Sequence, residues 1–396
     1  MVAPAQKIVL SGYYGFRNSG DEAVLQSILN ALKRQSELLG ISIEPVVLSI
    51  DPEWTTATYG VESVHRMKLA DVRRAIGESA GLISGGGSLL QDVTSGKSIP
   101  YYLGIIKLAQ WMGKPTFVYA QGIGPVQRKW FHPMIKSVFR KCAYVSVRDE
   151  QSRQLLMTMG LRQSEVHVVP DPVMGLTLPE ESDAGSNLVG QPAETHGAEP
   201  VSVTNSSSVS PDLPVVGISV RYWEKDRREL DAIVEGLRQV CRTLPVHLRF
   251  LPFHLPSDTE ASQYCMDKLG GDIAATGSVV SFCEDADHPQ KMLREVGACD
   301  VLLGMRLHSL IYAAGRRVPL IGISYDPKID HFLGRINCLP VGTTASLDST
   351  ALGKEIIRLL KGREVWRREK ERLIDSLIFE AEAPARQIVE YLRHKG

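Results

Sequence analysis

Short apolar runs of strand length alternate with segments of helical periodicity along most of the chain, and this alternation constrains the fold more than any other feature. In the first half, Ile8–Leu10 is an apolar run, and the apolar residues between Val24 and Leu32 recur at helical spacing. Further strand-length runs follow at 45–50, 81–84, 116–119, 144–147 and 166–169. Strands that alternate with amphipathic helices predict a mainly parallel sheet covered on both faces.

The composition changes between Pro179 and Pro214, where Ser, Gly, Pro and acidic residues dominate without apolar periodicity. Such a segment is typical of a flexible linker or surface loop. The alternation restarts at Val215 and ends in a long helical stretch, which Pro384 should interrupt. A chain of 396 residues is long enough for two cores. The sequence therefore predicts an α/β protein with two Rossmann-like, doubly wound domains that face a cleft, the GT-B-like arrangement.

The expected parts are an N-terminal domain over 1–178, a flexible linker over 179–213, a C-terminal domain over 214–362, and C-terminal helices over 363–396 that pack back on the N-terminal domain.

Charge and cysteine content exclude several classes of function. Lys plus Arg and Asp plus Glu number 45 each, so bulk charge gives no reason to expect a nucleic-acid partner. The six cysteines are far apart and form no CxxC pair, which favours buried thiols in a reducing compartment. No stretch approaches the roughly 18 apolar residues of a membrane span, and no cleavage-site pattern follows the N-terminal apolar run. A cytoplasmic protein is therefore expected.

Glycine-rich or charged segments directly follow several predicted strands. They are SGYYGFRNSGDEA, GGGSLLQD, AQGIGP, Arg148–Asp149, GMRLHS and SYDPK. Ligands in open parallel sheets bind beyond the carboxyl ends of the strands. Each glycine turn alone is equally compatible with a tight βα connection. Neither GxGxxG nor the P-loop pattern is complete, which argues against a standard NAD or ATP site. Because both halves carry such segments at the same end of their sheets, we predict one site shared across a cleft.

The segment Gly304–Ser309 gives the sharpest signal for an anion site. It places Arg306 and His308 at the start of a helix, whose free N–H groups and positive dipole end suit a phosphate. Arg306 adds a cation with bidentate geometry. The structural alternatives are a surface ion pair for Arg306, a core histidine for His308, an interdomain salt bridge for Arg148 and a solvated side chain for Lys328.

Taken together, FRNSGDEA, SGGGSLLQD, QGIGP, VRD, GMRLHSLIYAA and SYDPKI resemble the polysaccharide pyruvyltransferases in order and spacing. The resemblance runs from about Lys7 to Leu333 and skips the Ser-rich segment. The chain is most similar to the CsaB-type ketal pyruvyltransferases of bacterial cell-wall glycan synthesis. The departure from the simplest family pattern is the long Ser-rich segment, which bears on domain motion more than on chemistry.

The resemblance implies a GT-B-like fold, phosphoenolpyruvate (PEP) as donor, and a cyclic 4,6-ketal of pyruvate on a sugar as product. In CsaB-type members the acceptor is an N-acetylmannosamine linked to N-acetylglucosamine on a lipid diphosphate. The pyruvylated polymer then anchors surface-layer proteins with SLH domains. PEP is a co-substrate in this scheme, and neither a cofactor nor a metal is expected.

The donor side is expected in the C-terminal domain, and the acceptor side in the N-terminal domain. The expected PEP-binding residues are Arg148, Arg306, Leu307, His308, Ser309 and Lys328. Arg306 and the helix N-terminus are expected to hold the phosphate, while Arg148 and Lys328 share the charge of carboxylate and phosphate. The expected acceptor-binding residues are Asn18, Gly86, Gln91, Asp92 and Gln121.

Acid–base chemistry near neutral pH points first to His308. Asp21 or Glu22 is a candidate to accept or orient the proton of a sugar hydroxyl. Acidic residues in a first helical turn are also favourable for capping alone, and Ser19 with Glu22 has the pattern of a capping box.

Two further segments have both a functional and a structural interpretation. Asp285-Ala-Asp287 has the D-x-D spacing of a metal motif, but a helix cap is the simpler interpretation. Arg128–Lys141 is basic and amphipathic, which is compatible with peripheral contact at the inner face of the cell membrane. Packing of its apolar stripe on the sheet is the favoured alternative.

Two other functions are compatible with the same GT-B-like fold. One is a GT-B-type nucleotide-sugar glycosyltransferase or epimerase, although no acidic residue for a donor ribose stands out at a strand end of the second half. The other is a non-catalytic two-lobed ligand sensor, although nothing in the sequence resembles an output domain.

Overall fold

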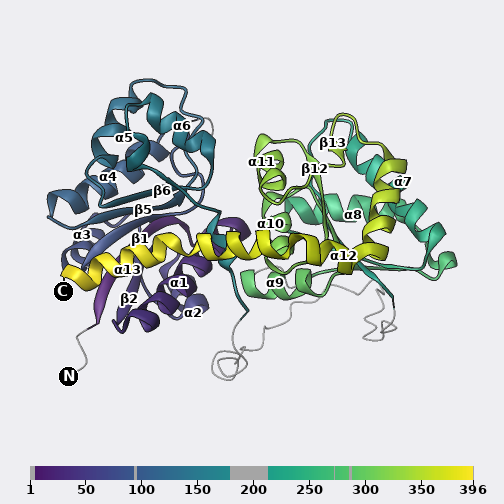
Figure 1. Cartoon of the computed structure of the whole chain (residues 1–396), viewed down its shortest axis with the longest axis horizontal. Coiled ribbons are helices and arrows are strands. Elements are labelled where there is room, and N and C mark those ends of the chain that lie inside the picture. The colour runs from purple at the N-terminus through teal and green to yellow at the C-terminus, as the bar shows by residue number, and fades with distance from the viewer. Residues whose placement is uncertain (1–4, 93–95, 179–212, 272, 285–287, 396) are drawn as a thin grey trace, which may run out of the picture.

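The computed structural model describes residues 5–92, 96–178, 213–271, 273–284 and 288–395. Figure 1 shows two lobes side by side, one from each half of the chain, with the yellow C-terminal helices running across both. Each lobe is built on its own parallel sheet. The predicted fold class is therefore confirmed. The predicted linker over 179–213 lies, apart from Leu213, outside the described residues.

The N-terminal sheet has the strand order β3-β2-β1-β4-β5-β6-β7 within the described part of the chain, and its paired strands are parallel. The chain starts in the middle, runs to one edge and returns to place β4 beside β1, as in a doubly wound fold. The strands are β1 (Gln6–Tyr14), β2 (Ile43–Ser49), β3 (Glu62–His65), β4 (Gly81–Gly85), β5 (Thr116–Gln121), β6 (Tyr144–Val147) and β7 (His167–Val168). The helices are α1 (Ser19–Leu39), α2 (Pro52–Tyr59), α3 (Leu69–Glu78), α4 (Ser98–Trp111), α5 (Phe131–Phe139), α6 (Glu150–Thr158), and the 3-10 turns η1 (Gln163–Glu165) and η2 (Pro172–Gly175).

The C-terminal sheet repeats this order as β10-β9-β8-β11-β12-β13, again with parallel pairs. Its strands are β8 (Val215–Ser219), β9 (His247–Phe250), β10 (Val279–Phe282), β11 (Val301–Gly304), β12 (Leu320–Ser324) and β13 (Gly342–Thr343). Its helices are α7 (Arg228–Thr243), α8 (Ser257–Leu269), the 3-10 turn η3 (Ala274–Thr276), α9 (Pro289–Gly297), α10 (Leu307–Gly315) and α11 (Pro327–Arg335). The chain ends in α12 (Ser349–Ala381) and α13 (Ala383–Lys395), with Pro384 in the first turn of α13.

The central strands are buried on both faces, which explains why they read as continuous apolar runs. In β1, Ile8 and Leu10 belong to one core cluster and Val9 to another, because successive strand residues point to opposite faces. The cluster around Val9 also contains residues of α3, α4 and α5. The cluster around Ile8 continues through α1 and α13 into the C-terminal lobe. The two lobes therefore share apolar packing.

The C-terminal helices fix one lobe to the other. The ring of Tyr391 in α13 packs edge-on against Phe117 of β5, with centroids 5.3 Å apart. At the junction between α12 and α13, Glu382 is buried and accepts hydrogen bonds from Arg34 and Gln35 of α1, the latter at 3.0 Å. This helical arm holds the relative position of the lobes, and with it the geometry of any site between them.

The predicted capping box at the start of α1 is wrong. Asn18 is the N-cap, and its Oδ1 accepts a hydrogen bond from the Gly20 backbone N–H at 3.1 Å. Glu22 instead reaches back to the loop that precedes the helix. An asparagine N-cap satisfies the free N–H groups as well as serine does, so the alternative was equally available from sequence.

Candidate functional site

The candidate site lies where the carboxyl ends of the N-terminal strands meet the start of α10. The Gly20 Cα at the start of α1 lies against the imidazole of His308, since a Cβ built on Gly20 would be 2.6 Å from His308 Nδ1. Only glycine permits this approach. A second close approach joins α1 to the loop after β4: a Cβ on Gly87 would lie 2.7 Å from Asp21 Oδ1, and Gly87 has φ +68°. Segments far apart in the sequence thus meet at one place.

Arg148, at the end of β6, is held in a fixed orientation. Its side chain is only 9% exposed. Nη1 donates to Asp171 Oδ2 at 3.1 Å, and Nη2 donates to Ser88 Oγ at 2.8 Å. Asp149 Oδ2 lies 3.8 Å from Nε. The guanidinium is therefore pre-organised between the loops that follow β4, β6 and β7.

His308 lies beside the same carboxylate. Its Nε2 is 4.0 Å from Asp171 Oδ2, and this nitrogen is buried without a hydrogen-bond partner among the described residues. A buried, unpartnered nitrogen is costly in a folded protein, and a catalytic role is one of the reasons for which a native site keeps such a group. Asp171 of the N-terminal lobe therefore connects Arg148 with His308 of the C-terminal lobe, as the strand-end argument requires.

The surroundings keep the imidazole neutral near pH 7. Burial lowers the pKa of His308 below its ordinary value, and the carboxylate of Asp171 opposes this effect. Nearby cations lower the pKa further. These cations are Arg148, Arg306 and Lys328. A neutral imidazole can accept a proton, and an incoming anion would offset the cations and favour protonation.

Asp21 is the carboxylate best suited to exchange protons here. Burial raises the pKa of Asp21 to about 7, Glu22 adds to the rise, and Arg148 opposes it. A carboxyl group that titrates near neutral pH is suited to acid–base chemistry. Its predicted role in handling a sugar hydroxyl remains a prediction that is compatible with this environment.

Glu22 is engaged in structure. Its Oε1 accepts from the backbone N–H groups of Gly15 and Arg17 at 2.9 and 3.2 Å, and its Oε2 accepts from Tyr59 Oη at 2.8 Å. The side chain is 1% exposed. These contacts favour a role in shaping the loop before α1 over direct contact with substrate.

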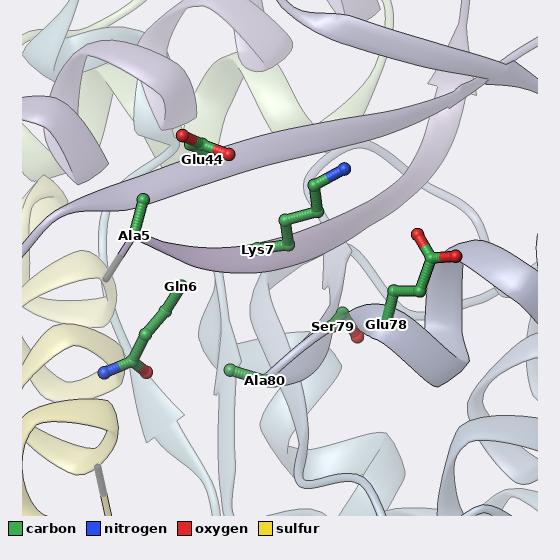
Figure 2. Close-up of a pocket in the computed structure, with 7 residues that line it drawn as sticks. All are labelled: Ala5, Gln6, Lys7, Glu44, Glu78, Ser79 and Ala80. Atoms are coloured by element: carbon green, nitrogen blue, oxygen red, sulfur yellow. The ribbon is translucent and has the colours of Figure 1, made fainter.

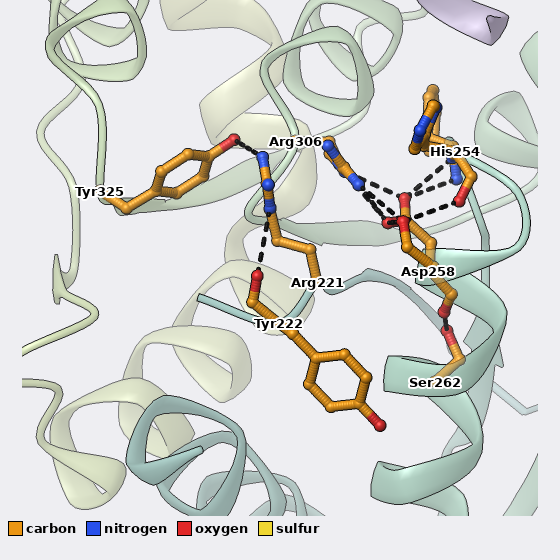
Figure 3. Close-up of polar contacts among 9 residues, drawn as sticks. Arg221, Tyr222, His254, Asp258, Ser262, Arg306 and Tyr325 are labelled. Atoms are coloured by element: carbon orange, nitrogen blue, oxygen red, sulfur yellow. Dashed lines mark hydrogen bonds and ion pairs between the residues drawn. The ribbon is translucent and has the colours of Figure 1, made fainter. Parts of the chain in front are cut away.

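Arg306 is paired within its own lobe (Figure 3). Its Nε donates to Asp258 Oδ2 at 3.0 Å, and its Nη2 bonds to Asp258 Oδ1. Asp258 is fully buried and also accepts from the His254 backbone N–H at 2.9 Å. Asp258 therefore compensates most of the charge of Arg306, and an anion near Arg306 would meet the Nη1 edge, which makes none of these contacts.

The other predicted donor residues differ in exposure. Ser309 is buried, and its Oγ donates to the Arg306 carbonyl at 2.7 Å, so the hydroxyl is used inside the first turn of α10. Leu307 is half-buried against the core. Lys328 is exposed at the start of α11, where Asp326 caps the helix through the Lys328 backbone N–H at 2.9 Å. The charge of Lys328 lowers the pKa of His308, but less than burial, Arg148 and Arg306 do.

Two of the predicted acceptor residues, Asn18 and Asp92, use their side chains to bond backbone N–H groups. Asn18 caps α1. Gly86 has φ +54° and lies against Val24. Asp92 accepts from the backbone N–H groups of Gln127 and Arg128, both at 2.8 Å. Gln91 is half-buried and has polar contacts of its own.

Gln121 differs from the others because its side chain is fully buried, and both amide atoms lack a hydrogen-bond partner among the described residues. It is the strongest of the five acceptor candidates, since its donors and acceptors are unused.

Sequence reasoning missed two residues that belong to this region. Asp171 follows β7 in the motif PDP, and Arg221 lies two residues beyond the end of β8 in the motif SVRYW. The strand-end rule that identified Arg148 would have found both.

Two cavities lie elsewhere. One of about 470 Å³ is lined by Lys7, Glu44, Glu78 and their neighbours (Figure 2). It borders the amino-terminal part of β1, the edge opposite the one where ligands bind in open parallel sheets. The other, of about 810 Å³, follows β1, β2 and β3 and is lined by Phe16, Asp51 and His65 among others. Neither lining includes Arg148 or His308.

The basic amphipathic segment Arg128–Lys141 contains α5. Phe131, Ile135, Val138 and Phe139 are buried in the core, so most of the apolar stripe packs on the sheet. Trp130 and Met134 remain exposed at 58% and 41%. Peripheral membrane contact through these exposed residues stays a prediction. None of the described helices is long and apolar enough to cross a membrane.

Among the described residues, no group of three or more His, Cys, Asp or Glu side chains is arranged to hold a metal ion. The D-x-D motif at Asp285 and Asp287 lies outside the described residues. The cysteines are free, and four of the six are buried.

Comparison with known proteins identifies both the family and the fold. The family model described as "Polysaccharide pyruvyl transferase" matches residues 18–327. No curated protein matches the chain. Among solved structures, a UDP-GlcNAc 2-epimerase from Methanocaldococcus jannaschii aligns with a TM-score of 0.62 at 11% identity, covering 98% of this chain and 99% of that one.

Two further structures are similar over a comparable length. HepE from Anabaena, in complex with UDP and glucose, has a TM-score of 0.56 at 14% identity and covers 98% of this chain and 100% of its own. A glycosyltransferase from Rickettsia africae has a TM-score of 0.56 at 12% identity and covers 98% of both chains. At such low identity these likenesses show the two-domain fold and nothing more specific.

Proposed function

The chain belongs to the polysaccharide pyruvyl transferase family, and on that premise we propose that it is a ketal pyruvyltransferase with PEP as its donor. The family implies transfer of pyruvate onto a polysaccharide. The proposed acceptor is an N-acetylmannosamine in a lipid-diphosphate-linked cell-wall glycan precursor, and the proposed product carries pyruvate on the 4- and 6-hydroxyls. The pyruvylated polymer would serve to anchor surface-layer proteins with SLH domains.

The observation that carries the proposal is the convergence of Arg148 and His308 on Asp171. Arg148 comes from the N-terminal lobe and His308 from the C-terminal lobe, yet both lie within 4.0 Å of Asp171 Oδ2. A fixed guanidinium beside a neutral imidazole suits a ligand that carries negative charge and exchanges a proton. PEP has a carboxylate, a phosphate and a methylene carbon that must be protonated.

The reaction balances without an oxidant or reductant. A proton adds to the methylene carbon of PEP, and one sugar hydroxyl attacks C2 and loses its proton. The second hydroxyl then attacks C2, the C2–O bond to phosphate breaks, and the second hydroxyl proton leaves with the phosphate group. The products are a cyclic ketal and inorganic phosphate.

His308 is the proposed acid–base group of this scheme. Burial and the surrounding cations lower its pKa in the free protein, and the negative charge of bound PEP would offset the effect of the cations and so favour protonation of the imidazole. Arg148 and Lys328 are proposed to bind the carboxylate and phosphate. Asp21, whose pKa is about 7, is proposed to take the proton of an attacking hydroxyl.

The experiment that tests the function uses the full chain, PEP and a ManNAc-GlcNAc diphosphate-linked acceptor. We expect the acceptor to gain the mass of a pyruvate ketal while one phosphate is released per ketal formed. Release of phosphate without a mass gain on any acceptor would contradict a pyruvyltransferase.

Ligand-induced thermal stabilisation separates this function from the alternatives, because a ligand that binds only the folded state raises Tm. We expect stabilisation by PEP and not by UDP-sugars. Stabilisation by UDP-sugars alone would favour a nucleotide-sugar glycosyltransferase or epimerase, which the UDP complex of HepE makes the leading competitor. Stabilisation by PEP without turnover of any glycan would favour a sensor.

A further inference from the structure

Arg221 is an arginine with a fixed position and no carboxylate partner. It follows β8, and Figure 3 shows its guanidinium between the ring of Tyr325 and the backbone of Tyr222. Nη1 donates to Tyr325 Oη at 3.0 Å, and Nε donates to the Tyr222 carbonyl at 3.4 Å. Its Cζ lies 5.0 Å from each of the ring centroids of Trp223 and Tyr325. All of these contacts are to neutral groups.

The charge of Arg221 is uncompensated, in contrast to that of Arg306. Among the described residues, no carboxylate lies within 4.0 Å of the Arg221 guanidinium, whereas Arg306 forms an ion pair with the buried Asp258. Arg221 is half-buried, so water cannot fully replace a counter-ion. A rigid, partly desolvated cation of this kind is suited to a planar or tetrahedral oxyanion.

Other donors surround the same point. His254 follows β9, and Arg221 and Arg306 both lie close enough to lower the pKa of its imidazole, an effect that adds to the larger one of burial. Lys328 lies three residues beyond Tyr325 in the segment after β12. Arg221, His254 and Arg306 thus lie at the carboxyl ends of β8, β9 and β11, and Lys328 follows β12 at the same edge of the sheet.

Four acidic residues of this region have contacts with groups other than Arg221. Asp258 pairs with Arg306, and Asp326 caps α11. Asp330 accepts from Ser324 Oγ at 2.6 Å, and Glu224 accepts from Thr344 Oγ1 at 2.8 Å. None of these carboxylates lies within 4.0 Å of the Arg221 guanidinium, so the direct contacts of this cation are to neutral groups only.

We propose that Arg221 is the main cation of a phosphate-binding site at the carboxyl ends of β8, β9, β11 and β12, with His254 and the open Nη1 edge of Arg306 as additional donors. The identity of the molecule that carries the phosphate rests on the proposed function. That molecule is either PEP or the lipid-linked acceptor, whose diphosphate presents the same oxyanion chemistry.

The test begins with inorganic phosphate as the probe, because its binding does not depend on the proposed reaction. In calorimetric titrations, Arg221→Gln is expected to weaken phosphate binding by about 10- to 100-fold, which is the effect of losing one or two charge-assisted hydrogen bonds. Arg221→Lys keeps the positive charge but loses the planar guanidinium with its paired N–H donors, so this variant should bind phosphate with intermediate affinity. The lysine variant also separates loss of charge from loss of packing on the rings.

The matched control is Arg227→Gln. The Cζ of Arg227 also lies over two aromatic rings, 4.6 and 4.9 Å from the centroids of Tyr222 and Tyr264, but the side chain is exposed and lies at the N-cap of α7, at the far end of the β8–α7 connection. It should bind phosphate like the wild type. Equal phosphate affinity in the wild type and in Arg221→Gln, with both variants folded, would overturn the proposal.

Steady-state kinetics of Arg221→Gln identify the source of the phosphate. A higher KM for PEP alone assigns the site to the donor. A higher KM for the diphosphate-linked acceptor, but not for the same disaccharide on an apolar aglycone without phosphate, assigns it to the acceptor. If the wild type turns over neither PEP nor the acceptor, the proposed function fails. The phosphate titration still shows whether Arg221 binds phosphate.

Discussion

Replacement of His308 by alanine is expected to lower kcat by about 10²- to 10⁴-fold, the usual contribution of a positioned acid–base group. The reason is that His308 Nε2 is buried without a partner beside Arg148 and Asp171, where it is placed to exchange a proton with a bound anion. The measurement is the initial rate of phosphate release at saturating PEP and acceptor. The melting temperature should stay close to that of the wild type, since the variant removes a nitrogen that has no hydrogen-bond partner among the described residues.

The control for this variant is His331→Ala. His331 is another imidazole of the C-terminal lobe that reaches the N-terminal lobe, through a 2.8 Å contact of its Nε2 with Gln151 Nε2, but it is exposed. Its loss should leave kcat within about twofold, as expected for a surface position away from the chemistry. Near-normal turnover in His308→Ala would remove His308 as the acid–base group.

The second large effect is expected at Asp171, which is both a structural partner and an electrostatic one. Asp171→Ala should lower the free energy of unfolding by about 3 kcal/mol, because the buried Arg148 loses its closer carboxylate and keeps only the 3.8 Å contact with Asp149. The side chains of the pair are 9% and 7% exposed. The substitution also removes the acceptor for the Val173 backbone N–H, which Asp171 Oδ1 holds at 3.2 Å. Urea denaturation measures the loss.

Asp171→Asn removes the negative charge of Asp171 and should disturb folding less than Asp171→Ala does. The charge of Asp171 raises the pKa of His308, so its removal must lower that pKa. The limb of the pH profile of kcat/KM that reports His308 should therefore move to lower pH. The other charged groups that act on this imidazole are Arg148, Arg306 and Lys328, and all of them remain in the variant.

Asp149→Asn is the control for both Asp171 variants. Asp149 is the neighbouring carboxylate, 3.8 Å from Arg148 Nε, and its main contact is a cap on α6 through the Ser152 backbone N–H at 2.7 Å. It should cost at most about 1 kcal/mol of stability and leave the pH profile in place. An unmoved limb in Asp171→Asn would show that Asp171 does not act on the imidazole.

The sequence predicted the two-sheet fold well where strands are buried on both faces. Central strands such as β1, β4, β5 and β11 read as apolar runs because helices cover both of their sides. The strands β3, β10 and β13 were not predicted. They lie at or near sheet edges and are short and partly exposed, so they carry no continuous apolar run.

The candidate site was only partly predictable. Position at the end of a strand was enough to bring Arg148 and His308 together. Side-chain pairing was not predictable, because it depends on loops distant in sequence: Asp258, which compensates Arg306, is 48 residues away from it. The same limit explains why the pairing of Asp171 with Arg148 was not predicted, and why Glu22 was expected to take part in the chemistry although its carboxylate holds the loop before α1.

The central claim is that both lobes bind one donor molecule, and calorimetric titration of the full chain with PEP tests it most directly. We expect one PEP per chain, with affinity at least about 10-fold weaker in Arg148→Ala, from the N-terminal lobe, and in Lys328→Ala, from the C-terminal lobe. The control is Lys354→Ala, an exposed lysine of α12, which should bind PEP like the wild type. Unchanged affinity in either of the first two variants, or two independent PEP sites per chain, would contradict a donor held jointly by the two halves.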